Sequence, residues 1–421
     1  MCIAHASFSQ FLMDMLDTTT NEGKGLLHIV RNFDHLKLSG YIQPQFQVAE
    51  QKGIESFEGG DFAPRVSNRF MFRRSRVKID YAHFGNERSP DFHIVFQFDA
   101  NERGFTVRDV WGRVFENRFK LFSFTTGMFA RPFGYEVNLS SSDRESPERG
   151  RMSQILMKSE RDLGAMVSFD SRKKNGALNF LKMDLGLFNG QGINAQGDFD
   201  NYKDLIGRIY TKPIEINNLS ISGGASILYG GLENSTKYIY TTVSEGGIKN
   251  LQVDSSLSNI GSRSPRKYFG ADAQLKLKNK KGFTQLRGEI IAGKQSGTVI
   301  DSETPTRLPE GMEGFHVRNF RGGYAYFIQD LFSPRHSILV KYDVYDPNTD
   351  VSGGEIGATG TGFTKGDIKY QTVGVGYLNH ITPNVKLLAY YAMVKNESTN
   401  LPGFTSDVND DVFTLRIQFR F

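Results

Sequence analysis

The sequence predicts an all-β protein, a transmembrane antiparallel β-barrel of about 16 strands. First, segments of roughly ten residues recur from Leu36 onward in which apolar and polar residues alternate, as in a strand with one apolar and one polar face. Second, the connections between these segments alternate between short and long. Third, the chain holds 44 Gly, 34 Phe and 17 Tyr, which favours strands and tight turns over helices.

Composition narrows the class of protein further. The 421 residues have a mean hydropathy of -0.40, and no run of roughly 18 apolar residues occurs, which excludes a helical membrane protein. The single cysteine, Cys2, excludes a disulfide within the chain. The formal net charge of +5 is a mild bias that says little about any one site.

Residues 1–35 differ from the rest of the chain. Ala4-His5-Ala6 has the A-x-A form of a signal-peptidase site, so residues 1–6 are interpreted as a signal-peptide remnant; a chance match and a lipid-modified Cys2 are the alternatives. Residues 7–35 are predicted to form a short periplasmic helical segment that packs at the mouth or partly plugs the lumen, with a flexible tail as the alternative. The apolar residues at helical spacing are Phe8, Phe11, Leu12, Met15, Leu26, Ile29 and Val30.

The barrel itself is assigned to residues 36–421. In one segment, Val77, Ile79 and Tyr81 alternate with charged neighbours, and the same period returns along the chain. The strands are predicted to begin near Leu36, Arg69, Asp91, Gly104, Arg118, Glu160, Leu178, Lys203, Asn218, Lys267, Phe283, Val317, Arg335, Gly366, Pro383 and Asp411.

The connections support a membrane barrel over a soluble β-sandwich, which is the alternative fold. One set is short, as in "KNKK" and "HIT", and the other is mostly long, with only "NER" after the third strand breaking the rule. Short periplasmic turns at one mouth and long outer loops at the other are the plan of a bacterial outer-membrane barrel. The long loops are predicted at residues 50–68, 130–159, 189–202, 230–266, 294–316, 347–365 and 396–410.

The segment "DVFTLRIQFRF", Asp411 to Phe421, alternates throughout and is predicted to be the last strand. A barrel leaves no open edge only if its last strand pairs with its first. We therefore expect this segment to pair with the strand that begins near Leu36.

Several motifs resemble the phosphate-selective porin O and P family, in the form common among Bacteroidetes outer-membrane porins. They are "FMFRRSRVKIDYAHFG" in the second strand, "PFGYE" at Pro132–Glu136, "SPERGRMSQ" at Ser146–Gln154, "ERDLG" at Glu160–Gly164 and "LFNGQG" at Leu187–Gly192. The resemblance implies a trimeric, sixteen-stranded, water-filled porin whose third external loop folds inward and narrows the channel. Here that loop is residues 130–159.

Phosphate-selective members of that family line the pore with arginines and place a lysine or arginine at the constriction. The residues matched to this role by region are Arg74, Arg76 and Lys78 on the second strand and Arg144, Arg149, Arg151 and Lys158 on the third loop. Arg416 on the last strand is added as an inward-facing cation.

Physical arguments support cations in the lumen. Arg74, Arg76 and Lys78 share the parity opposite to the apolar residues, and a cation facing lipid would cost roughly 2 to 4 kcal/mol. Arginine suits phosphate because its guanidinium donates two hydrogen bonds to adjacent oxygens. Acidic residues accompany these cations: Asp80, Asp99, Asp184 and Asp343 lie on the inward faces of their own strands, and Asp143, Glu145 and Glu148 lie among the arginines of the third loop. This mixture of signs favours a general diffusion pore over a one-sign filter. The structural alternative for the arginines is that they only pair with Asp and Glu and fix the loop against the wall.

Other kinds of site find little support. Asp346, Asn348 and Asp350 place oxygen ligands at every second position, a weak calcium pattern that is more typical of a turn. No histidine pair has zinc-ligand spacing, no cofactor motif is present and no exposed Ser and His pair indicates an enzyme.

The sequence therefore predicts a porin of the bacterial outer membrane, and no enzyme. It would allow passive diffusion of small hydrophilic solutes with some preference for anions, phosphate being one candidate. The expected partners are the lipid bilayer, lipopolysaccharide, small anionic or neutral solutes and further copies in a homotrimer, but no nucleic acid. The alternative is a plugged or scaffold barrel whose outer loops act as an interaction, receptor or adhesin surface.

Overall fold

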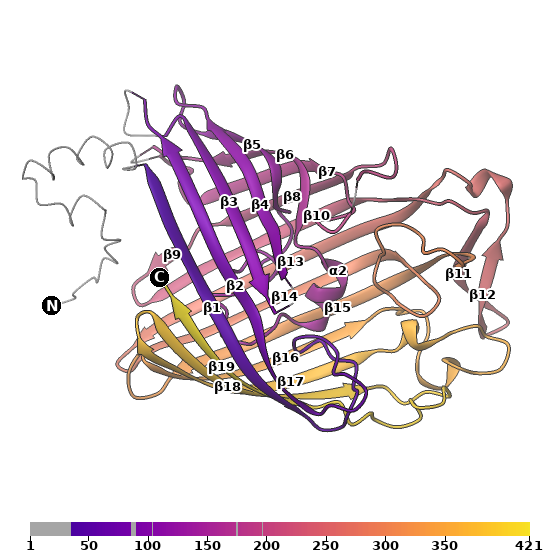
Figure 1. Ribbon diagram of the computed structural model, residues 1–421. Coiled ribbons are helices and arrows are strands. Elements are labelled where there is room, and N and C mark those ends of the chain that lie inside the picture. Colours follow the sequence, from indigo (N-terminus) through magenta and orange to yellow (C-terminus); the bar gives the residue numbers. More distant parts are fainter. Residues whose placement is uncertain (1–34, 86–89, 103, 174–175, 196) are drawn as a thin grey trace, which may run out of the picture.

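The computed structural model describes residues 35–85, 90–102, 104–173, 176–195 and 197–421. The interpretations of residues 1–6 as a signal-peptide remnant and of residues 7–34 as helical lie outside these described residues. One antiparallel barrel dominates the fold (Figure 1). Its 16 wall strands are β1 (Leu36–Ala49), β2 (Asn68–His83), β3 (Phe92–Asn101), β4 (Gly104–Phe115), β5 (Phe122–Ala130), β6 (Arg161–Asp170), β7 (Leu181–Phe188), β8 (Asp204–Thr211), β10 (Leu219–Glu233), β13 (Arg263–Asn279), β14 (Gly282–Gly297), β15 (Gly314–Asp330), β16 (His336–Asp346), β17 (Tyr370–Thr382), β18 (Val385–Asn396) and β19 (Val412–Arg420).

The predicted barrel and its strand positions are confirmed. Consecutive wall strands pair antiparallel all the way round, and β1 pairs with β19 from Tyr41 opposite Arg420 to Ala49 opposite Val412, which closes the wall. The wall strands begin close to their predicted positions; at β5, one of the larger differences, the strand begins at Phe122 and was expected near Arg118. Figure 1 shows the start of β1 and the C-terminus at one mouth and the long loops at the other.

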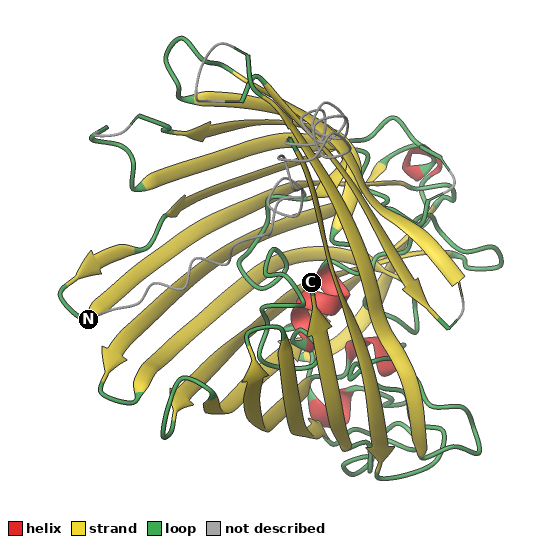
Figure 2. Cartoon of the chain, turned by 60° about the vertical axis from the view of Figure 1, so that its left-hand side comes forward, coloured by secondary structure: helices red, strands yellow, loops and turns green. Residues whose placement is uncertain are grey.

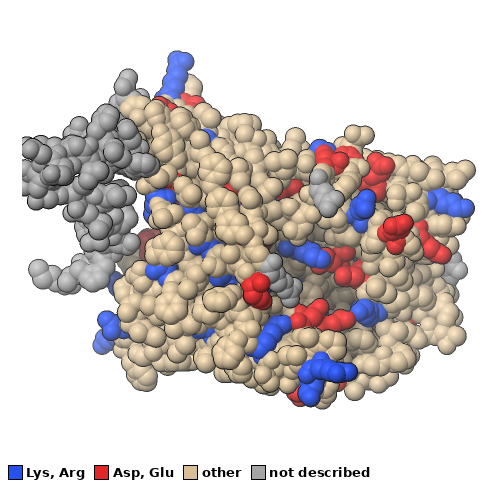
Figure 3. All heavy atoms as spheres, viewed as in Figure 1, with Lys and Arg blue, Asp and Glu red and all other residues tan. Residues whose placement is uncertain are grey.

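The barrel presents apolar side chains outward, the reverse of a soluble protein. In β7, Met183, Leu185 and Leu187 are exposed while Asp184 and Phe188 are buried in the interior. Because the closed wall also pairs the backbone groups of its strands, it suits a lipid surround. In Figure 3, most of the visible Asp and Glu gather over the half of the molecule that carries the long loops.

The remaining elements are not part of the 16-strand wall. β9 (Ile214–Ile216) pairs with the start of β10, and β11 (Tyr238–Glu245) and β12 (Ile248–Asp254) form a hairpin in the long loop that follows β10. β11 also pairs in parallel with the loop end of β15. The helical turns are α2 (Arg151–Leu156), η2 (Leu257–Asn259), η3 (Gly353–Glu355) and η4 (Lys365–Asp367). No helix in the described ranges has the length and apolar character needed to cross a membrane.

The third loop, defined here as residues 131–160, folds into the lumen and carries α2 with it (Figures 1 and 2), as predicted. Its apolar side chains Phe133, Met152 and Leu156 belong to one buried cluster with residues of the wall. Many of these wall residues are on β13 to β18, namely Tyr268, Phe320, Tyr326, Leu339, Tyr345 and Tyr390, and others are on β5–β8 and β10. The main apolar core therefore lies inside the barrel, between the third loop and the wall.

Candidate functional site

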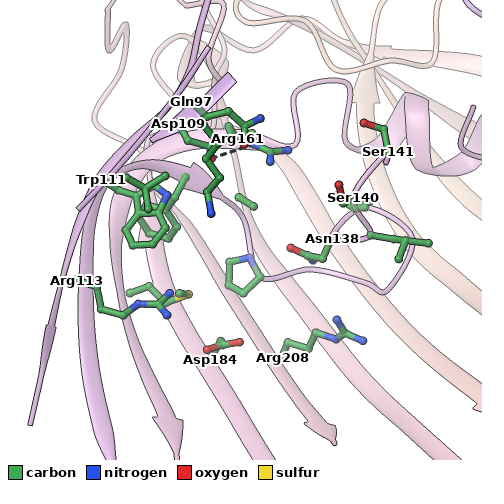
Figure 4. Close-up of a pocket in the computed structure, with 18 of the residues that line it drawn as sticks. Gln97, Asp109, Trp111, Arg113, Asn138, Ser140, Ser141, Arg161, Asp184 and Arg208 are labelled. Atoms are coloured by element: carbon green, nitrogen blue, oxygen red, sulfur yellow. Dashed lines mark hydrogen bonds and ion pairs between the residues drawn. The ribbon is translucent and has the colours of Figure 1, made fainter. Parts of the chain in front are cut away.

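The third loop divides the lumen into two unlike halves. On one side, its residues are hydrogen-bonded to β1, the loop end of β2, β14–β16, β18 and β19, and we call this the anchored half. On the other side, a cavity of about 420 Å³ lies between the loop and β3–β8, with Arg76 and Lys78 of β2 at its edge, and we call this the open half. Figure 4 shows Trp111 and Arg113 of β4 on the wall of this cavity, with Asn138 and Ser140 of the loop across from them.

Glu148 is the main ionic anchor of the third loop. Its side chain is 3% exposed, and its carboxylate accepts from Arg74 at 2.7 Å, from Arg73 at 2.8 Å and from Arg416 at 3.0 Å. Burial alone would raise the pKa of Glu148, but the neighbouring guanidinium groups hold that pKa well below its usual range. Buried charges are tolerated only when they are paired in this way, so the loop and both strands depend on one carboxylate.

A second group of carboxylates fixes the first part of the loop. Glu136 accepts from Ser153 Oγ at 2.6 Å, from Tyr326 Oη at 2.8 Å and from the Gly150 amide. Burial opposes its ionised form, yet Lys341 at 3.7 Å and the Ser153 hydroxyl lower the pKa of Glu136. Glu289 on β14 in turn accepts from the backbone amides of Tyr135 and Glu136, both at 3.1 Å. The backbone of the loop is thereby hydrogen-bonded to the wall.

The open half carries a charged wall opposite a neutral rim. The loop contributes five residues without charge to the rim, namely Val137, Asn138, Leu139, Ser140 and Ser141, and one cation, Arg149. In all, seven basic residues line the cavity against two acidic ones, and six of the seven stand on the wall across from the loop. The basic residues are Arg76, Lys78, Arg113, Arg149, Arg161, Lys182 and Arg208, and the acidic ones are Asp109 and Asp184. The passage is therefore polar, wet and biased toward positive charge.

Most of these cations are paired. Arg76 contacts Asp99 at 2.9 Å and donates to Tyr41 Oη at 2.8 Å and Ser141 Oγ at 2.9 Å. Arg208 contacts Asp272 at 2.8 Å, and Arg161 contacts Asp109 at 3.1 Å. Such pairing fixes the side chains and weakens their field along the passage.

Two cations of the charged wall, Arg113 and Lys182, differ from the others in their contacts. Arg113 donates to Thr125 Oγ1 at 2.8 Å and lies 5.2 Å from the centre of the Trp111 ring. Lys182 Nζ lies 5.5 Å from the centre of the Tyr210 ring. Within the part of the chain that the structure describes, neither has a carboxylate oxygen within 4.0 Å. Their charges are thus the least neutralised of the passage.

The passage continues toward the mouth that holds the short turns. A second hollow of about 250 Å³ shares Tyr41, Arg76, Lys78 and Gln97 with the first and reaches Lys37 and Arg420. On the side of the long loops, a vestibule of about 460 Å³ lies beside the base of the third loop and is lined by Lys158 and Asn194. Polar side chains thus line cavities near both mouths of the barrel.

The structure distributes the predicted site residues over three places. Arg76, Lys78 and Arg149 line the passage. Arg74, Arg144 and Arg416 lie in the anchored half, where Arg144 is fully buried and donates to the carbonyl oxygens of Ser146 and Pro147. Arg151 and Lys158 lie on the outer side of the loop: Arg151 stacks on Tyr370 at 3.6 Å, and Lys158 pairs with Glu303.

The residues of the weak calcium pattern form a turn after β16. The Asn348 amide nitrogen donates to Asp346, the Asp350 amide to Asn348, and Asp350 Oδ2 accepts from Asn319 at 2.7 Å. Their oxygens are therefore engaged in hydrogen bonds of the loop. Among the described residues, no group of three or more His, Cys, Asp or Glu side chains is arranged to hold a metal ion.

Trp111 and Arg113 were missed by sequence reasoning as passage residues. The signal that could have found them is the alternation in β4, where Val110 and Val114 face outward, 38% and 59% exposed. Trp111 and Arg113 have the opposite parity and therefore face the lumen.

Comparison with known proteins identifies barrels of the same fold. No protein-family model matches the chain, and no curated sequence matches it. The structure is similar to Pseudomonas putida OprB, with 10% identity, coverage of 95% of this chain and 96% of that one, and a TM-score of 0.56. It is also similar to an anion-selective porin from Comamonas acidovorans (11% identity, 92% and 99% coverage, TM-score 0.53) and to the outer-membrane channel DcaP of Acinetobacter baumannii (11%, 92% and 97%, 0.53). At sequence identities of 10% to 11%, these similarities show a shared fold.

The closed wall, the apolar outer band and this shared fold place the protein in the bacterial outer membrane. A barrel whose strands are paired all round leaves no open sheet edge in the lipid. Side chains such as Phe70, 85% exposed, and Ile290, 67% exposed, would be unfavourable in water but suit a hydrocarbon surround.

Proposed function

We propose that this protein is a porin, a channel for passive diffusion of small hydrophilic solutes with a preference for anions, and that it has no enzymatic activity. The observation that carries the proposal is the charged wall of the open half, where Arg113 and Lys182 face a neutral rim of Asn138 and Ser140. A pore selects ions when its lining replaces part of their hydration with groups of the right sign. The similarity to a porin described as anion-selective is consistent with this proposal.

Phosphate is the specific anion that we propose as a candidate solute, because the second strand and the third loop resemble those of the phosphate-selective family. Arg113 offers the planar fork that matches two phosphate oxygens, and Lys182 offers a compact charge nearby. The mixed signs of the wall, with Asp109 and Asp184 in the same cavity, favour broad anion preference over a dedicated phosphate filter. We also propose, from the same resemblance, that the protein is a homotrimer.

The test is conductance of the purified protein in a planar bilayer. We expect open channels in steps of three, a reversal potential in a potassium chloride gradient that indicates anion preference, and weak block by added phosphate. In the double variant Arg113→Gln/Lys182→Gln the ratio of anion to cation permeability should fall by roughly threefold for each charge, the Boltzmann factor for about 0.7 kcal/mol at 6 Å in water.

The matched control is Arg118→Gln, an exposed arginine beside a short turn, which should leave the reversal potential unchanged. An unchanged reversal potential in the double variant would refute the role of the charged wall. Absence of any conductance in the wild-type protein would instead support the alternative of a plugged scaffold barrel with an interaction surface on its outer loops.

A further inference from the structure

On three neighbouring strands, the outward-facing apolar residues are followed by an outward-facing cation on the side of the long loops. Along β13, the outward residues Leu277, Leu275 and Phe269 are exposed apolar side chains, and the next outward residue toward the long loops is Lys267. On β14 the same position is taken by Lys294, and on β15 by Arg321. The pairing places Lys267 opposite Lys294, and Ala292 of β14 opposite Arg321.

A hollow of about 760 Å³ lies on the outer surface of the same strands, and Arg321 is one of its lining residues. Its apolar lining is Phe269, Ala271, Ile290, Ala292, Gly323 and Tyr342, and Asp346, Lys369 and Gln371 line its polar end. The small residues alternate with large ones, so the hollow is a gap in an otherwise bulky apolar wall. A Cβ at Gly323 would lie 2.9 Å from the Glu289 carbonyl oxygen and 3.2 Å from Ile290 Cγ2, so this position has no room for a side chain.

None of the three cations forms a close ion pair within the described parts of the chain. In the described parts of the chain, Lys267, Lys294 and Arg321 have no carboxylate oxygen within 4.0 Å, although Asp346 is opposite Arg321 in the strand register. Lys267 Nζ instead lies 5.0 Å from the centre of the Tyr229 ring. On the other half of the wall, the loop ends of the strands carry exposed apolar residues in the equivalent outward places, such as Phe70 and Phe105.

From this arrangement we propose that β13–β15 bind a phosphorylated, multiply acylated lipid of the outer leaflet. The phosphates would contact Lys267, Lys294 and Arg321, and an acyl chain would fill the hollow. The charges are complementary, and the cations stand at the loop-side boundary of the apolar band, where lipid headgroups lie.

A second copy of the chain is a less suitable occupant. A protein interface here would take three cations out of water, and burial of charges without partners is strongly unfavourable. Charged residues, and lysine in particular, are depleted in the cores of protein interfaces. A lipid phosphate supplies the missing counter-charge.

The test uses the full-length protein in detergent, exchanged until it is free of lipid and then incubated with bisphosphorylated lipid A. Bound lipid is counted by native mass spectrometry. The wild-type protein should retain the lipid, and Lys267→Gln/Lys294→Gln/Arg321→Gln should bind it roughly 100-fold more weakly, as expected for loss of three cations at the membrane surface. Ala292→Leu, which fills the hollow, should also weaken binding while keeping every charge.

Controls separate this proposal from the proposed function. Lys281→Gln, in the short turn of the same hairpin at the opposite mouth, should bind like the wild type. The triple variant should conduct normally, because its cations face away from the lumen. The proposal would be overturned if the triple variant retained the lipid as well as the wild type does, or if inorganic phosphate at millimolar concentration displaced the lipid. It would also be overturned if the triple variant lost its oligomeric state but kept its lipid, because the cations would then serve an interface between copies.

Discussion

The two halves of the lumen contain the same kinds of side chain but use them differently. In the anchored half, Arg73, Arg74 and Arg416 converge on Glu148, and Arg74 and Arg416 are buried between loop and wall. In the open half, Arg113 contacts the Thr125 hydroxyl and the face of the Trp111 ring. Both halves are rich in arginine, so arginine content alone does not indicate which surface conducts ions.

The difference between the halves shows that carboxylates of the loop pair with the cations of the wall and neutralise them. Where the loop supplies Glu136, Glu145 and Glu148, the wall cations become structural pairs. Where the loop supplies serine and asparagine, Arg113 and Lys182 on the opposite wall stay available to solutes. The charge carried by the loop thus decides which half is a scaffold and which half is a passage.

Removing the central carboxylate should break the anchored half most severely. Glu148→Gln keeps the size of the side chain but leaves the buried guanidinium groups of Arg74 and Arg416 without a carboxylate partner. We expect the free energy of unfolding to fall by about 3 to 5 kcal/mol. Unfolding in urea can be followed by fluorescence of Trp111, the single tryptophan of the chain.

The control for this variant is Asp143→Asn, which breaks the half-exposed pair with Arg420. An exposed pair contributes about 1 kcal/mol or less. If Glu148→Gln were as mild as this control, the anchored half would not depend on its ionic centre.

The loop between β1 and β2 should make the anchored half sensitive to pH. Glu58 is buried near Lys341, Glu148, Asp343 and Arg416; burial raises its pKa from 4.5 to about 7, against the opposing effect of Lys341. A folded-state pKa above the unfolded value means that the folded protein binds the extra proton, so stability falls as pH rises from about 4.5 through 7. Glu58→Gln should therefore stabilise the protein at pH 8, by at most about 3 kcal/mol, and have little effect at pH 4.

Urea unfolding of both proteins at the two pH values checks this expectation. Glu55→Gln serves as the comparison, because Glu55 lies in the same loop with its side chain 78% exposed. Equal stabilisation at both pH values, or none at pH 8, would contradict it.

Adding a carboxylate to the neutral rim of the loop should make the open half resemble the anchored half. Ser140 is exposed on the rim of the passage, and Ser140→Asp would place a negative charge opposite the charged wall. The anion preference should fall by roughly threefold, which corresponds to about 0.7 kcal/mol at 6 Å in water. Reversal potentials measure the change, and Ser140→Asn, which adds a similar volume without charge, should leave them unaltered. A similar shift in both variants would assign the effect to size.

The smallest effect is expected at the outer side of the loop. Lys158 is 65% exposed and pairs with Glu303, so Lys158→Gln should change the free energy of unfolding by about 0.5 kcal/mol or less and the reversal potential by little. A large loss of anion preference in this variant would move the selective region from the open half to the vestibule.

Sequence reasoning predicted the wall well and the lumen only partly. Strand positions follow from local alternation and turn residues, which the chain carries at every segment. The hairpin of β11 and β12 was expected to be an irregular loop, because its polar strands, such as Tyr238–Glu245, lack a clear apolar face.

The use of each arginine could not be read from local pattern. Arg74 and Arg76 have the same parity, yet Arg74 pairs with the loop and Arg76 lines the passage. The distinction depends on Glu148, which is 74 residues from Arg74 and 268 from Arg416 in the chain. Contacts over such separations arise only when the barrel has closed, so parity can place a cation in the lumen but cannot assign its partner.

Glu148 also has a consequence for the order of assembly. Its partners Arg74 and Arg416 stand on β2 and β19, and β1 lies between these two strands and pairs with both. The carboxylate therefore bridges the seam where the barrel closes. Until β19 has reached β1, one of the three guanidinium partners of Glu148 is missing, and the loop has no complete place to dock. We expect closure of the seam and docking of the third loop to occur as one cooperative step, so that an unsealed barrel is also one whose passage has not yet formed.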